Sequence, residues 1–76
     1  MEDLMARIVI DQRVMVGKPI IKGTRITVDA ILDSLASGMT IEEIAKDYVV
    51  KVEDVRAAIA YARKIVAGEE VVPLEA

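Results

Sequence analysis

The feature that most constrains this fold is a change in the spacing of apolar residues at Thr27. Before this position the sequence is rich in β-branched residues that partly alternate with polar ones, which is typical of short strands. After it, apolar residues recur every three or four positions, which is typical of helices that bury one face. The sequence therefore predicts a mainly α fold, with a short N-terminal β-arm or hairpin at residues 7–26 and a helical core at residues 27–68.

Glycine and proline divide this β-arm into two segments. Residues 7–16 (RIVIDQRVMV) predict one short strand, and residues 20–21 predict a second strand that ends at Gly23. Between them, Gly17 and Pro19 supply the backbone freedom and the fixed φ angle that tight turns require. The arm is therefore expected to fold back on itself.

Three helices are predicted in the core. Thr27 caps the first, and Gly38 ends it. Thr40 and Glu43 have the spacing of a capping box that opens the second. A break at residues 49–51 precedes the third, which ends at Gly68. The expected inward faces are Val28, Ile31, Leu32 and Leu35, then Ile41, Ile44, Ala45 and Tyr48, then Val52, Val55, Ile59, Ala62 and Val66. A short capped helix, a tight turn and a longer helix are typical of a helix-turn-helix domain.

Composition narrows the classes of function. The 76 residues form one domain, in which 54% are hydrophobic but 3% aromatic, so a second copy or another protein is expected to cover part of the surface. Cysteine and histidine are absent, which excludes a disulfide, the usual zinc sites, a thiol nucleophile and an imidazole base. Ser34 and Ser37 have no histidine to activate them, and the carboxylates are explained as helix-start or surface charges. We therefore expect no enzyme activity, cofactor or metal.

The first residues resemble neither a signal peptide nor a membrane span, so we expect a cytoplasmic protein.

Positive charge is concentrated in the β-arm. Residues 13–25 hold four cations and no acid, whereas residues 26–76 hold five cations and ten acids in a chain of net charge -3. Glycines and proline explain the backbone of this segment but not Lys18, Lys22 and Arg25, which can neutralise nucleic-acid phosphates. The alternative is that these cations are surface charges that pair with acids of the helices, such as Asp29 or Asp33.

The third helix is less suited to reading DNA. In a helix-turn-helix domain the first half of this helix enters the major groove. Here that half contains Glu53 and Asp54, which repel phosphates, and Arg56, which can contact a guanine edge. The alternative role of the two acids is to stabilise the positive end of the helix dipole. Arg56 is therefore the expected base contact.

Several motifs resemble one known family. They are Gly17-Lys18-Pro19, Gly23-Thr24-Arg25-Ile26, Glu53-Asp54-Val55-Arg56 and Ala60-Tyr61-Ala62, within a stretch from Ile8 to about Val72. The stretch resembles small prokaryotic proteins catalogued as domain of unknown function 433, regarded as VapB-type antitoxins with a homeodomain-like or winged helical fold. The resemblance implies a dimeric, DNA-binding antitoxin that neutralises a PIN-like ribonuclease and regulates transcription of its own operon.

The resemblance implies two partners, operator DNA and the toxin, and each candidate residue is expected to contact one of them. We expect Lys18, Lys22 and Arg25, together with Lys51 beside the turn, to contact phosphates of operator DNA, and Arg56 to contact a base. The acidic and apolar tail, residues 69–76, is expected to be loosely ordered alone and to face the toxin through Glu69, Glu70, Val71, Val72 and Leu74. The alternative is a protein-interaction or dimerisation module that binds no DNA, which the net negative charge favours.

Two positions depart from the family pattern. Val49 stands where a proline is usual after Asp47-Tyr48, and Lys51 stands where a Ser or Thr cap is usual. Loss of such a cap costs about 0.5–2 kcal/mol, so Lys51→Ser is expected to raise the melting temperature.

Overall fold

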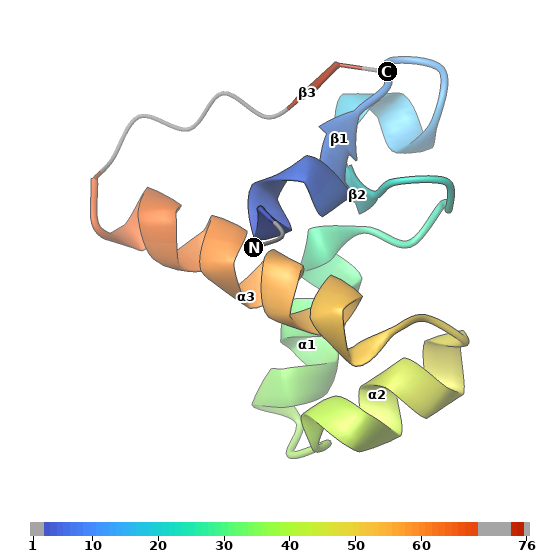
Figure 1. The fold of residues 1–76 in the computed structure, drawn as a ribbon, viewed down its shortest axis with the longest axis vertical. Helices are drawn as coiled ribbons and strands as arrows, with labels where there is room; N and C mark the ends of the chain where they lie inside the picture. Colours follow the sequence, from blue (N-terminus) through green and yellow to red (C-terminus); the bar gives the residue numbers. More distant parts are fainter. Residues whose placement is uncertain (1–2, 69–73, 76) are drawn as a thin grey trace.

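A small sheet packs on a group of three helices (Figure 1). The computed structural model describes residues 3–68 and 74–75. Its elements are η1 (Leu4–Arg7), β1 (Ile8–Ile10), η2 (Met15–Gly17), β2 (Pro19–Ile21), α1 (Val28–Ala36), α2 (Ile41–Tyr48), α3 (Val52–Val66) and β3 (Leu74–Glu75). The prediction of a mainly helical fold with an N-terminal hairpin is confirmed.

The hairpin is part of the hydrophobic core. β1 pairs antiparallel with β2, with Val9 opposite Ile20, and β3 lies parallel to β1 on its other side. Four aliphatic side chains of the hairpin are buried: those of Ile8, Val9, Ile20 and Ile21. β1 is shorter than the predicted strand because the chain turns at Asp11, whose carboxylate accepts a hydrogen bond from the backbone N–H of Arg13 at 2.9 Å. The hairpin is therefore fixed against the helices.

Each helix begins where its sequence signal predicts. Thr27 caps α1 by accepting from the N–H of Ala30 at 3.0 Å. In α2, Thr40 Oγ1 accepts from the N–H of Glu43 at 3.1 Å, and the Glu43 carboxylate accepts from the N–H of Thr40 at 2.8 Å. The break at residues 49–51 and the glycine after α3 also lie where expected.

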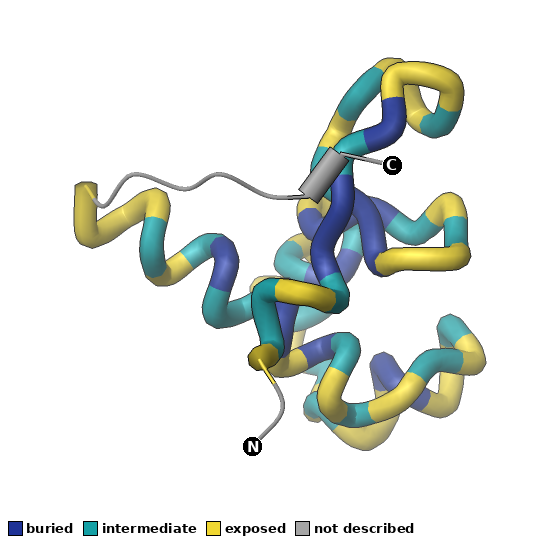
Figure 2. The backbone as a smooth tube through the Cα atoms, turned by 45° about the horizontal axis from the view of Figure 1, so that its top comes forward, coloured by how far each residue is buried: buried dark blue, intermediate teal, exposed yellow. Residues whose placement is uncertain are grey.

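Buried aliphatic residues of the core come from β1, β2, α1, α2 and α3, where Figure 2 colours stretches of the backbone as buried. Ile31 of α1, Ile44 of α2 and Val55 of α3 are completely buried together with Ile8 of β1. The predicted inward face of α3 is wrong at Val66, which is 88% exposed because α3 extends past the elements that cover it. The buried face of α3 instead includes Ala57, Ala58 and Tyr61. No helix within residues 3–68 is both long enough and apolar enough to cross a membrane.

Candidate nucleic-acid interface

Lys22 lies beside the first turn of α3. Its backbone N–H donates to the carbonyl oxygen of Arg7 at 2.8 Å, which continues the pairing of the hairpin by one residue. Its side chain is exposed and lines a small hollow with Ala6, Arg7 and Asp54. The hairpin therefore carries one predicted phosphate-binding lysine to the start of the helix that was predicted to read DNA.

Asp54 forms an ion pair with Arg7 and also caps α3, so its negative charge is compensated. Arg7 Nη1 lies 2.8 Å from Asp54 Oδ1, and the two side chains are 18% and 13% exposed. The other carboxylate oxygen of Asp54 accepts from the backbone N–H of Lys51 at 3.0 Å. Of the two acids expected to repel phosphates, Glu53 alone has an exposed side chain. The Arg7 guanidinium compensates the charge of Asp54, so the start of α3 carries less negative charge than its sequence alone indicates.

Lys51 is the N-cap residue of α3. An ammonium group has no acceptor, so its side chain cannot bond the free N–H groups of the first turn. The cap therefore consists of the Asp54 half of a capping box alone. The Lys51 side chain is exposed at the turn between α2 and α3.

Two turns that carry predicted cations project on the same side of the molecule. The turn of residues 22–25 follows β2, and the turn of residues 49–51 precedes α3; both extend to the right in Figures 1 and 2. Thr24 holds the first turn, because its hydroxyl donates to the carbonyl of Ile21 at 2.8 Å and accepts from the N–H of Ile26 at 3.0 Å. Arg25 is exposed on this turn.

Arg56 lies on the exposed face of α3, five residues after Lys51. Arg63 lies seven residues later on the same face, and the two arginines line a hollow of about 430 Å³ together with Leu4, Ile41, Ile59 and Ala60. Arg63 was not among the residues predicted to contact DNA. A seven-residue spacing is the signal that indicates a shared helix face.

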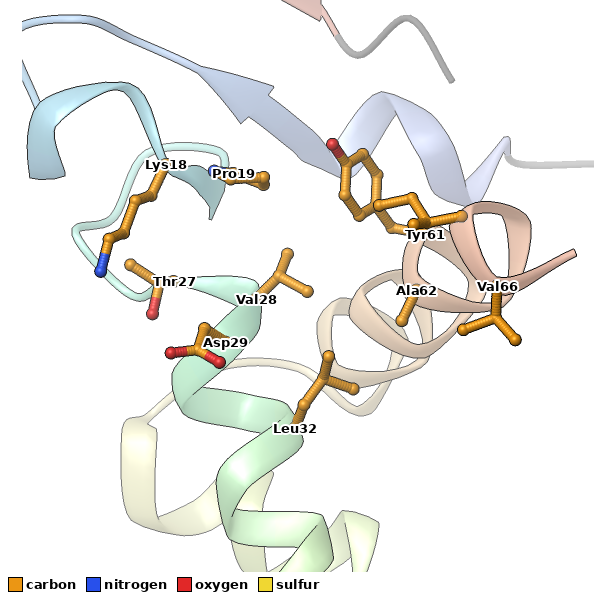
Figure 3. Close-up of a pocket in the computed structure, with 10 residues that line it drawn as sticks. Lys18, Pro19, Thr27, Val28, Asp29, Leu32, Tyr61, Ala62 and Val66 are labelled. Carbon is orange, nitrogen blue, oxygen red and sulfur yellow. The ribbon is translucent and has the colours of Figure 1, made fainter. Parts of the chain in front are cut away.

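Lys18 is separate from the other predicted cations. Its side chain lines a groove with Thr27 and Asp29 of α1 and with the C-terminal half of α3 (Figure 3). The structure thus places Lys22 beside the first turn of α3, which carries Lys51 at its N-cap and Arg56 in its second turn, with Arg25 on the turn of Lys22. Lys22 and Arg56 line different hollows, and Lys18 lines a third. Pairing with Asp29 or Asp33 was the alternative explanation for Lys18, Lys22 and Arg25, and across residues 3–68 the structure gives none of the three such an ion pair.

The predicted toxin-facing tail is described at one position. Leu74 lies opposite Val9 in the parallel pair of β3 and β1, so this end of the tail adds a strand to the sheet. Glu69, Glu70, Val71 and Val72 lie outside the described residues. In the described part of the chain, acidic side chains do not gather into a group of three able to hold a metal ion.

Comparison with known proteins supports one family. Residues 8–62 match the family described as protein of unknown function (DUF433). An uncharacterised protein of Archaeoglobus fulgidus is 73% identical over 26 residues, which are 34% of this chain and 72% of that protein. No solved structure matches. The family match starts at Ile8, as the sequence motifs predicted, and covers the hairpin, α1, α2 and most of α3. The chain therefore belongs to the family of proteins of unknown function described as DUF433.

Proposed function

We propose that this protein is the antitoxin of a type II toxin–antitoxin system, which binds operator DNA as a dimer and neutralises a PIN-like ribonuclease. The observation that carries the proposal is that Lys22 lies beside Asp54 in the first turn of α3, where Arg7 also compensates Asp54, while Lys51 and Arg56 are exposed at the N-cap and in the second turn of the same helix. An acidic chain that places exposed cations at one end of one helix has a surface suited to phosphates.

The order of α2, a three-residue turn and α3 supports a helix-turn-helix reading of this surface. In such domains the first turns of the second helix contact base edges, and residues of the turn contact the backbone. By this geometry Arg56 is the base contact, while Lys51, Lys22 and Arg25 contact phosphates. At the first two turns of α3, four cations (Arg7, Lys22, Lys51, Arg56) stand beside two carboxylates (Glu53, Asp54), so positive charge exceeds the repulsion that the helix sequence alone predicts.

The neutralising function rests on the family resemblance and on the composition of the tail. The tail combines Glu69, Glu70 and Glu75 with Val71, Val72 and Leu74, so it is suited to a cleft that is basic and partly apolar. A ribonuclease that binds a polyanion has such a cleft. The toxin is therefore expected to be a small nuclease encoded beside this gene.

A second candidate function is a protein-interaction module without DNA binding. The observation that favours it is an apolar groove lined by the exposed end of α3, distinct from the basic surface. This function predicts a stable complex with the neighbouring gene product and no complex with upstream DNA.

The test is binding of the purified protein to the DNA upstream of its own gene, measured by fluorescence anisotropy against a shuffled fragment of equal length. We expect tighter binding to the upstream fragment, and tighter binding still when the neighbouring gene product is added. Arg56→Ala is expected to weaken the upstream complex by about 1–3 kcal/mol and to leave the shuffled complex nearly unchanged. Equal binding to both fragments would contradict the operator function, and a complex with the partner alone would establish the second candidate.

A further inference from the structure

The groove beside Lys18 is an apolar crevice between three elements (Figure 3). Pro19 of β2, Val28 and Leu32 of α1, and Ala62 of α3 supply its apolar lining, and its volume is about 390 Å³. On this side of the crevice the small Ala62 side chain leaves the α3 backbone open to close approach by another helix. A crevice of this kind accepts a short turn of apolar helix.

An apolar projection lies at the edge of the same groove. Ile65 is 54% exposed and Val66 is 88% exposed, and both line the groove from the last turn of α3. Two exposed β-branched residues in succession at a helix end are costly to leave in water. Projection and groove therefore belong to one continuous surface.

The charges of this surface complement each other. Lys18 and Asp29 lie together at the end of the groove away from Val66 (Figure 3), and the structure gives neither an ion pair within residues 3–68. The last turn of α3 has the opposite pattern, because it carries Arg63 and Lys64, which do not line the groove of their own copy, and ends in backbone carbonyls at the negative pole of the helix. Asp29 therefore matches Lys64, and Lys18 matches the carbonyl end.

We propose that a second copy of this chain fills the groove, with each copy inserting the last turn of α3 into the groove of the other. A projection and its own complementary groove on one surface are what a two-fold symmetric interface requires, since every contact then occurs twice. In this dimer Ile65 and Val66 of one copy cover Leu32 and Pro19 of the other. Asp29 of each copy faces Lys64 of the other, and Lys18 faces the end of the other α3.

This inference supplies the surface of the dimer in the proposed function, but its test uses no DNA and no partner protein. Sedimentation equilibrium of the full chain is expected to give a dimer. Val66→Asp is expected to give a monomer with an unchanged circular dichroism spectrum, because the side chain contacts little within its own copy. The matched control is Val49→Asp, at a valine that is 89% exposed on the other side of the fold, and we expect it to stay dimeric.

The second measurement is the dimer dissociation constant of variants in which the charges of Asp29 and Lys64 are reversed. Asp29→Lys and Lys64→Glu are each expected to raise the dimer dissociation constant about tenfold, since each places two like-charge pairs at the interface. The double variant restores opposite charges and is expected to return the constant to near the wild-type value. A wild-type monomer, a dimer that survives Val66→Asp, or a double variant as weak as the two single changes combined would each overturn the proposal. Loss of DNA binding with the dimer intact would contradict the proposed function and leave this interface standing.

Discussion

Arg7 at the start of the hairpin and Asp54 in the first turn of α3 are joined by a bond of 2.8 Å across 47 residues of chain. The pair has both a structural and an electrostatic effect. It ties the hairpin to the helix start, since the Asp54 carboxylate also caps α3 through the backbone N–H of Lys51. It also compensates an acid at the surface proposed to meet DNA.

Removal of this pair is expected to destabilise the fold. Arg7→Ala leaves a half-buried Asp54 carboxylate without its cation, which costs about 2 kcal/mol in free energy of unfolding. Urea unfolding followed by circular dichroism measures the change. The matched control is Arg13→Ala, at an arginine that pairs with Asp11 at 3.0 Å but has 80% of its side chain exposed. The control is expected to cost less than about 1 kcal/mol, and equal losses would contradict the structural role of Arg7.

The N-cap residue of α3 lacks a side-chain acceptor, which predicts a stabilising substitution. Lys51→Ser places an acceptor at the N-cap, where the backbone is already extended (φ -83°, ψ 154°), and is expected to add about 1 kcal/mol. For a domain of this size, such a gain raises the melting temperature by about 4–8 °C. The comparison is Lys51→Ala, which removes the charge without adding an acceptor and should leave the temperature nearly unchanged. A lower or unchanged temperature for the serine variant would place the start of α3 elsewhere.

Val49 predicts opposite effects for two substitutions. It ends α2 with a left-handed φ of 58°, which is strained for a β-branched residue. Val49→Gly is therefore expected to stabilise the protein by about 1 kcal/mol, whereas Val49→Pro should destabilise it by about 3 kcal/mol because proline fixes φ near -65°. The control Lys46→Gly, at an exposed position within α2, is expected to destabilise. Thermal unfolding ranks the three, and a stable proline variant would contradict this backbone.

The capping box of α2 predicts a dependence on acid. The Thr40 backbone N–H and hydroxyl hold the pKa of the Glu43 carboxyl below its ordinary value. The ionised group therefore stabilises the fold above the ordinary glutamate pKa of about 4.3, and this contribution is lost as pH falls through the lowered value. Glu43→Gln should lower the melting temperature at pH 7, and the difference from wild type should narrow on acidification to about pH 3.

The matched control for this titration is Glu42→Gln, one residue earlier, where the carboxylate takes no part in the capping box. Its melting temperature should differ less from wild type at pH 7. If the Glu43→Gln difference stays constant from pH 7 to pH 3, the carboxylate does not support the cap.

The helices were predictable because their signals are local. The Thr27 cap, the Thr40 capping box and the break at residues 49–51 all depend on residues within one turn of each other. The error at Val66 has a physical cause, since helical period alone does not tell how far the neighbouring elements extend along α3. The burial of Tyr61 was missed because η1 and β1 also pack against α3, which local periodicity does not show.

The candidate surface was predictable in part. The cations were visible as a charge asymmetry, but Lys18 and Lys22 are four residues apart and nevertheless line different hollows, because β2 runs between them. The role of Arg7 was not predictable, since its partner Asp54 lies in a different element and the two meet through tertiary folding alone.

The measurement that tests the central claim most directly is the salt dependence of binding to upstream DNA. With Lys22, Arg25 and Lys51 on phosphates in both copies, the logarithm of the binding constant should fall with the logarithm of salt concentration with a slope of about -5. Lys22→Ala should reduce this slope by about 2 in the dimer, while Lys46→Ala, at an exposed lysine of α2, should leave it unchanged. No binding at low salt, or a slope that Lys22→Ala does not alter, would contradict the proposed nucleic-acid interface.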